Sequence, residues 1–107
     1  MKPAALLLMT SALLCGCAFY DSKTGFVPTR LEEGYQYFRY RTFADTAYPL
    51  DDAAAEKART GWLETWLADS GYAGTPYEVT KRDVLFRNTN ARGDVYDLHY
   101  DVRVIAH

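Results

Sequence analysis

The sequence predicts a small α+β domain of order β-α-β-β, with one helix packed on one face of a three-stranded antiparallel sheet. Residues 35–44 and 77–88 are rich in aromatic and β-branched side chains, and residues 95–106 alternate between apolar and polar. Residues 52–70 carry apolar side chains at helical spacing. With 107 residues, 49% of them hydrophobic, the chain has the size and composition of one globular domain.

The first strand, residues 35–44, has two chemically different faces. Both of its charged residues, Arg39 and Arg41, are odd-numbered. Because successive side chains of a strand point to opposite sides, we expect the even-numbered side to pack in the core. The expected core side consists of Gln36, Phe38, Tyr40, Thr42 and Ala44. The other side consists of Tyr35, Tyr37, Arg39, Arg41 and Phe43.

The helix has recognisable start and stop signals. Either Asp51 or Asp52 can accept hydrogen bonds from the free N–H groups of the first turn. Gly71 suits the left-handed position after a helix, and Tyr72 would then contact Leu67. One arc of the helix is expected to cover the sheet, and it carries Ala55, Ala58, Trp62, Leu63, Trp66 and Leu67.

The second strand changes phase along its length. Tyr77 and Val79 share one phase of alternation, whereas Val84 and Phe86 share the other. We expect a β-bulge near residues 81–83, because one extra residue would return both pairs to the same side.

The last strand is the most regular. A turn rich in Asn and Gly, residues 88–94, joins it to the second strand as a hairpin. We place it in the middle of the sheet, where Arg39 and Arg41 would lie beside Asp97 and Asp101. The alternative places the first strand directly beside the second. The expected core side of the last strand consists of Tyr96, Leu98, Tyr100, Val102 and Val104.

The start of the chain has the features of an export signal. Lys2 gives a positive start, and residues 4–14 form an apolar run of eleven residues. A membrane-spanning helix needs about 20 such residues, so this run has the length of a signal-peptide core. A box of four residues follows it: Leu14, Cys15, Gly16 and Cys17.

This box resembles the lipobox of bacterial lipoproteins, with Leu14 three residues before Cys17 and the small Gly16 directly before it. The resemblance implies cleavage after Gly16 and acylation of Cys17, so that several acyl chains anchor the protein in a membrane. Ala18 stands where an aspartate often marks retention in the inner membrane, which favours the outer membrane. We therefore divide the chain into a signal peptide (residues 1–16), an acylated cysteine with its tether (17–33) and a folded domain (34–107). The tether has no sustained period, and the alternative is that it includes a short edge segment near Phe26.

Composition excludes some functions and leaves others without a motif. The formal net charge is −2, which argues against a protein that binds nucleic acid through its phosphates. Ser22 and Ser70 are the serines left after cleavage, neither lies in a nucleophile motif, and no phosphate loop or dinucleotide fingerprint is present. We expect no enzymatic activity and no cofactor.

The strongest candidate for a metal or acid–base site is a row of three residues on the last strand: Asp97, His99 and Asp101. Alternate residues of a strand are roughly 6.6–6.8 Å apart, whereas a metal ion needs ligands that converge to about 2 Å. We therefore expect a solvated, ion-paired row, with a metal site as the weaker alternative.

The strongest candidate for a partner site is the outer side of the first strand: Tyr35, Tyr37, Arg39, Arg41 and Phe43. Tyrosine and arginine are common at the energetic centres of interfaces. The alternative is an ordinary solvent-facing surface. The first and second strands would also be exposed edges, open to strand addition or to a homodimer. We expect Trp62 and Trp66 to pack on the sheet. Arg59 lies on the same arc, and it either extends past the tryptophans to solvent or meets a carboxylate or a ring face.

Two functions follow from these features. The first is a non-enzymatic lipoprotein of the bacterial envelope, facing the periplasm, that contacts another envelope protein. The second is a periplasmic module that binds a small molecule or a glycan. The second needs a concave aromatic pocket, for which one helix on three strands leaves little room.

Overall fold

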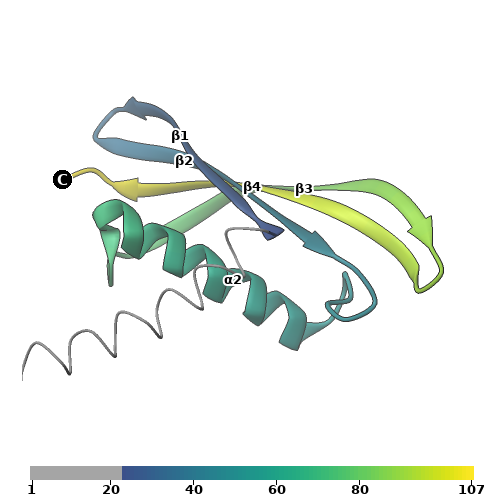
Figure 1. The fold of residues 1–107 in the computed structure, drawn as a ribbon. Helices are drawn as coiled ribbons and strands as arrows, with labels where there is room; N and C mark the ends of the chain where they lie inside the picture. Colours follow the sequence, from purple (N-terminus) through teal and green to yellow (C-terminus); the bar gives the residue numbers. More distant parts are fainter. Residues whose placement is uncertain (1–22) are drawn as a thin grey trace, which may run out of the picture.

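The computed structural model describes residues 23–107, in which α2 (Ala53–Leu67) crosses one face of a four-stranded antiparallel sheet (Figure 1). A short π-helical turn, η1 (Ala68–Tyr72), continues the helix. The strands are β1 (Gly25–Glu32), β2 (Tyr35–Ala44), β3 (Tyr77–Asn90) and β4 (Gly93–Ile105), and their order in the sheet is β1-β2-β4-β3.

The predicted α+β class and the central place of the last strand are confirmed, because β4 pairs with both β2 and β3. The predicted number of three strands is wrong. Residues 25–32, which we assigned to the tether, form the edge strand β1 and cover the edge that we expected β2 to expose. The strand β3 remains an edge, as expected.

The sequence conceals β1 for physical reasons. Its register with β2 shifts between Pro28 and Arg30, so its side chains show no single alternation. Proline has no N–H to donate, and an edge strand tolerates it. The turn to β2 has positive φ at both central residues, Glu33 (53°) and Gly34 (82°). Hairpins usually place Asn or Asp before the Gly of such a turn, so Glu33 gave no signal.

Aromatic packing holds β1 against the helix. The Phe26 ring stacks on Phe38 at 4.5 Å between centroids and on Trp66 at 5.7 Å. The Trp66 indole N–H donates a 2.8 Å hydrogen bond to the hydroxyl of Thr24, which is only 4% exposed. The folded domain therefore begins at least as early as Thr24.

The core lies between α2 and the sides of β2 and β4 that we expected to be buried. The buried residues of β2 are Phe38, Tyr40, Thr42 and Ala44, and those of β4 are Leu98, Tyr100, Val102 and Val104. The helix adds Ala55, Arg59, Leu63 and Leu67, while Trp62 and Trp66 pack against the core partly buried.

The predicted bulge in β3 is confirmed near its expected place. The register with β4 shifts between Val79 and Lys81, which aligns Val79 with Val102 and Val84 with Leu98. A second shift, between Phe86 and Asn88, was not foreseen. The strands continue further than expected, to Asn90 and from Gly93, so the turn is short and the hairpin projects past the start of α2 in Figure 1.

Both helix signals are confirmed. The Asp52 carboxylate accepts a 2.9 Å hydrogen bond from the N–H of Ala55. Gly71 has φ 93° and ψ 11°, a left-handed conformation in which glycine meets no steric cost. The regular helix ends at Leu67, earlier than predicted, because η1 takes up the following residues.

Candidate functional site

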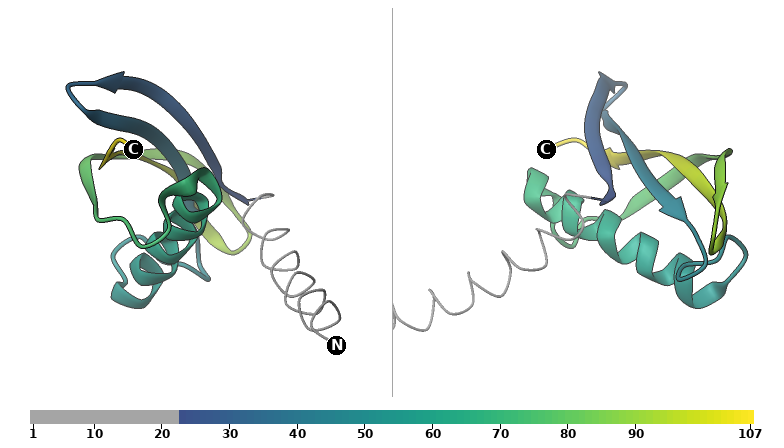
Figure 2. Two further views of the ribbon diagram at one scale, coloured as in Figure 1. Left: turned by 90° about the vertical axis from the view of Figure 1, so that its left-hand side faces the viewer. Right: turned by 45° about the vertical axis from the view of Figure 1, so that its right-hand side comes forward.

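The face of the sheet opposite α2, called the open face from here on, carries no described element (Figure 2). The side chains of Tyr35, Tyr37, Arg39 and Arg41 lie on it, as predicted from their alternation with the buried residues of β2. The register with the neighbouring strands adds exposed apolar residues to the same face. These are Val27 (54% exposed), Leu85 (50%) and Ile105 (68%).

Two arginines stack on the two tyrosines of the open face. The Cζ atom of Arg30 lies 3.8 Å from the centroid of the Tyr37 ring. The Cζ atom of Arg103 lies 4.3 Å from that of Tyr35. Arg103 also donates to the Tyr37 hydroxyl (3.4 Å) and to Glu78 (2.8 Å), and these hydrogen bonds raise the pKa of Arg103 further above its ordinary value. The stacking favours this arrangement of the four side chains by about 0.5–1 kcal/mol per pair.

The two outward arginines of β2 differ in their partners. Arg39 forms a 3.1 Å ion pair with Asp101 of β4, as the strand order led us to expect. Arg41 lies opposite His99 in the register and forms no ion pair or hydrogen bond with any residue of 23–107. Its guanidinium is therefore available to an incoming acceptor.

Phe43 lies on the side of the open face, because it pairs with Asp97 and lines a hollow with Arg41 and Arg87, but contacts outside the strand half-bury it. Its ring stacks on Trp62 of the helix at 5.7 Å between centroids and meets the edge of Tyr48 at 5.7 Å. Tyr48 and Trp62 contact each other as well, at 5.1 Å. The ring of Phe43 therefore joins the end of β2 to the helix and to the loop that follows the strand.

The side chains of Asp97, His99 and Asp101 are half-buried, and arginines bind the two carboxylates. Arg87 binds the carboxylate of Asp97 through two hydrogen bonds, of 2.5 and 3.2 Å, and Arg39 binds that of Asp101. Within residues 23–107, no group of three His, Cys, Asp or Glu side chains is arranged to hold a metal ion.

Sequence reasoning missed the role of Arg59, which is completely buried. Its guanidinium donates hydrogen bonds of 3.1–3.3 Å to four backbone carbonyls, and its Nε donates to Glu56 at 3.0 Å. The four carbonyls belong to Phe43, Tyr48, Pro49 and Leu50. The sequence placed Arg59 on the core-facing arc. Its acceptors could not be predicted, because every residue has a backbone carbonyl and no residue type marks those that bind Arg59.

Glu56 joins the helix to the sheet. Its carboxylate accepts hydrogen bonds from Tyr100 (2.7 Å) and Arg59 (3.0 Å), and it forms an ion pair with Arg82 (3.2 Å). Partial burial alone would raise the pKa of Glu56, but these hydrogen bonds and charges outweigh it and hold the pKa below its ordinary value. Burial and the bond to Glu56 raise the pKa of Tyr100. This cluster is structural, because each of its polar groups is used within the fold.

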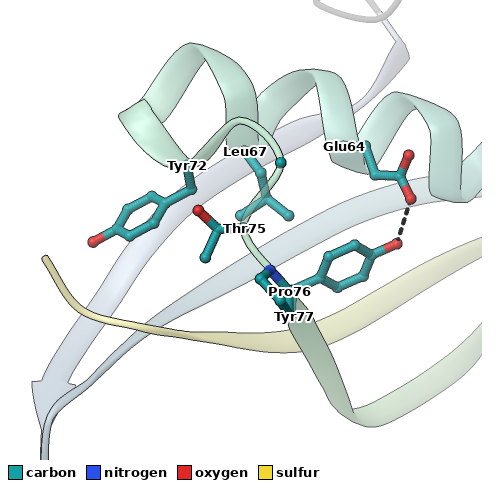
Figure 3. A pocket seen from close by; sticks show the side chains of 7 residues that line it. Glu64, Leu67, Tyr72, Thr75, Pro76 and Tyr77 are labelled. Atoms are coloured by element: carbon teal, nitrogen blue, oxygen red, sulfur yellow. Dashed lines mark hydrogen bonds between the residues drawn. The ribbon is translucent and has the colours of Figure 1, made fainter.

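A hollow of about 460 Å³ lies beside the C-terminal half of α2, where we expected little room for a pocket (Figure 3). Leu67 and the rings of Tyr72 and Tyr77 supply its apolar surface, and Glu64 and Thr75 supply polar groups. The Tyr77 hydroxyl donates a 2.9 Å hydrogen bond to Glu64, and partial burial together with that carboxylate raises the pKa of Tyr77 to about 12.

Comparisons with known proteins add no relative: no protein-family model matches the chain, and no curated protein or solved structure resembles it significantly. None of the helices in the described part of the chain is long and apolar enough to cross a membrane. The lipobox residues Leu14 to Cys17 and the neighbouring Ala18 lie outside the described residues.

Proposed function

We propose that this protein is a non-enzymatic lipoprotein of the bacterial envelope. It is anchored through acyl chains on Cys17, faces the periplasm and lies in the outer rather than the inner membrane. Its task is to dock an envelope protein on the open face of its sheet. The anchor rests on the lipobox resemblance of Leu14, Gly16 and Cys17. The docking role rests on the structure of the open face.

One observation carries the docking role: the paired stacks of Arg30 on Tyr37 and Arg103 on Tyr35. Tyrosine and arginine bury large areas at interfaces while keeping polar tips for hydrogen bonds. Side chains that are already ordered lose less conformational entropy when a partner arrives.

The surroundings of the stacks support the same role. The exposed Val27, Leu85 and Ile105 give the open face apolar area, and Arg41 offers a guanidinium with no partner among residues 23–107. Such a mixture favours a folded protein surface with carboxylates and apolar groups over a nucleic acid, in keeping with the net charge of −2.

The test is photo-cross-linking in cells, with a photoreactive phenylalanine analogue at Tyr37 and a control at Lys57. Lys57 is exposed on the helix and therefore reports the opposite side of the domain. We expect one discrete adduct from position 37 and none from position 57, with the adduct weakened by Arg30→Ala. The same adducts from both positions, or none from either, would contradict the assignment. An adduct of twice the monomer mass would replace the envelope protein with a second copy of this chain.

A further inference from the structure

The hollow in Figure 3 lies on the helix side of the sheet, away from the open face, and has features of a ligand site of its own. Its volume of about 460 Å³ falls within the range of small-molecule sites, roughly 300–1,000 Å³. It is formed where α2, η1, the loop of residues 73–76 and the first residue of β3 meet.

The charge of the lining is one-sided. Glu64 supplies a carboxylate at one end, and no lysine, arginine or histidine is among the described residues that line the hollow. The Tyr77 hydroxyl occupies only one carboxylate oxygen, Oε2. No residue of 23–107 donates a hydrogen bond to the other oxygen, Oε1, which is left to accept one from a ligand.

The remaining surface suits a cation with an apolar shell. The ring of Tyr77 borders the hollow beside Glu64, and aromatic faces attract ammonium groups. Leu67 and Thr75 add apolar surface and a hydroxyl. The hydrogen bond to Glu64 holds the Tyr77 ring, whereas the Tyr72 ring points away from Tyr77 and stacks on His107 with 4.3 Å between the ring centroids.

We propose that this hollow binds an aliphatic ammonium group beside the Tyr77 ring, with Glu64 as the counter-charge. The group comes either from a free small amine or from a lysine side chain of another protein. Both sources share this chemistry. Because Glu64 is exposed, water screens part of the attraction, and the binding is weak for a single ammonium group.

The test is an NMR titration of the ¹⁵N-labelled full-length protein in a non-ionic detergent. Three probes of similar shape are compared: tetramethylammonium, neutral tert-butanol and anionic pivalate. We expect the backbone amides of Glu64, Thr75 and Tyr77 to shift most with tetramethylammonium and least with pivalate. If tert-butanol bound as tightly as tetramethylammonium, the hollow would be merely apolar and the proposal would be wrong.

Variants locate the charge. Glu64→Gln keeps the shape and the acceptor for Tyr77, and we expect it to weaken tetramethylammonium binding about five-fold, the effect of about 1 kcal/mol. Asp83→Asn removes an equal charge from the exposed edge strand β3 and should leave binding unchanged. Equal binding by the wild type and Glu64→Gln would overturn the proposal.

A second arm identifies the source of the ammonium group. A blocked Gly-Lys-Gly tripeptide is titrated beside n-butylammonium, a free primary amine in its protonated form. Tighter binding of the tripeptide supports the proposal with a lysine side chain as the ligand, and tighter binding of n-butylammonium supports it with a free amine. Failure of both to bind would overturn it.

Discussion

The hydroxyl of Tyr100 on β4 donates a 2.7 Å hydrogen bond to the carboxylate of Glu56 on α2. This contact joins residues 44 positions apart and fixes the helix over the centre of the sheet. Because the acceptor is a carboxylate that Arg59 and Arg82 also bind, the junction is sensitive to protonation.

Acid should weaken this junction. The pKa of Glu56 lies below its ordinary value in the folded state, so the carboxylate adds stability above the pKa of an unfolded glutamate, about 4.3. That stability is lost as the pH falls through the lower folded pKa. We expect Glu56→Gln to lower the free energy of unfolding by about 1 kcal/mol at pH 7 and to make it fall less steeply below pH 4.3. Urea unfolding across pH 3–7 measures this, with the exposed Glu33→Gln as the control. Parallel pH profiles for Glu56→Gln and the wild type would contradict it.

Arg59 should be the most sensitive polar position of the core. Replacing Arg59 by methionine removes its hydrogen bonds to four backbone carbonyls, of which that of Tyr48 keeps the N–H of Asp45, and we expect a loss of about 3 kcal/mol or more. Arg82→Met breaks an ion pair that is 35% exposed on both sides and should cost about 1 kcal/mol or less. Chemical unfolding at pH 7 compares the two, and an equal loss would mean that the carbonyl contacts contribute little.

The membership of β1 in the domain can be tested at Phe26. Phe26→Ala removes the ring that stacks between Phe38 and Trp66, and we expect a loss of about 2 kcal/mol. Val27→Ala, at a neighbouring position that is 54% exposed, should change stability by less than about 0.5 kcal/mol. Were residues 25–32 a tether, neither substitution would alter the thermal unfolding midpoint.

Two glycines should respond to alanine in opposite directions. Gly71 has φ 93°, so Gly71→Ala should destabilise by about 1–2 kcal/mol although its new methyl group meets no atom. Gly61 lies within α2 with nothing within 4 Å of an added Cβ, so Gly61→Ala should stabilise by about 0.5–1 kcal/mol. Thermal unfolding of the pair checks the signs, and a gain at Gly71 would refute the left-handed helix end.

The acylation site should separate the two cysteines. Cys17→Ala should abolish incorporation of an alkyne-tagged palmitate in cells, whereas Cys15→Ala should not. The physical reason is the spacing of the box, in which the small Gly16 precedes only Cys17. Label retained in Cys17→Ala and lost in Cys15→Ala would reverse the cleavage assignment.

Helices and strands with a regular spacing of apolar residues were predictable from the sequence. Features that depend on contacts with residues distant in the sequence were not. The alternation in β4 and the caps Asp52 and Gly71 gave the helix, the core and the strand order. Of β1, only a short edge segment near Phe26 was considered, because the register shift and the edge position of the strand erase the pattern that burial imposes. For the candidate sites, the outward tyrosines and arginines of β2 were predicted, but the contacts of Phe43 with Tyr48 and Trp62 were not, because these partners come from other elements.

The early start of the domain at Thr24 changes what the proposed anchor can do. About seven residues separate Cys17 from Thr24, and they can span at most about 25 Å. This is half of the roughly 50 Å that a tether ending at Glu33 would allow. A domain held so close explores only the thin layer of periplasm next to its membrane. Its partners must therefore come to that layer, and neighbours confined to the same membrane would meet it at a high local concentration. With the proposed anchor on Cys17, the protein is then suited to act on what lies at one membrane surface.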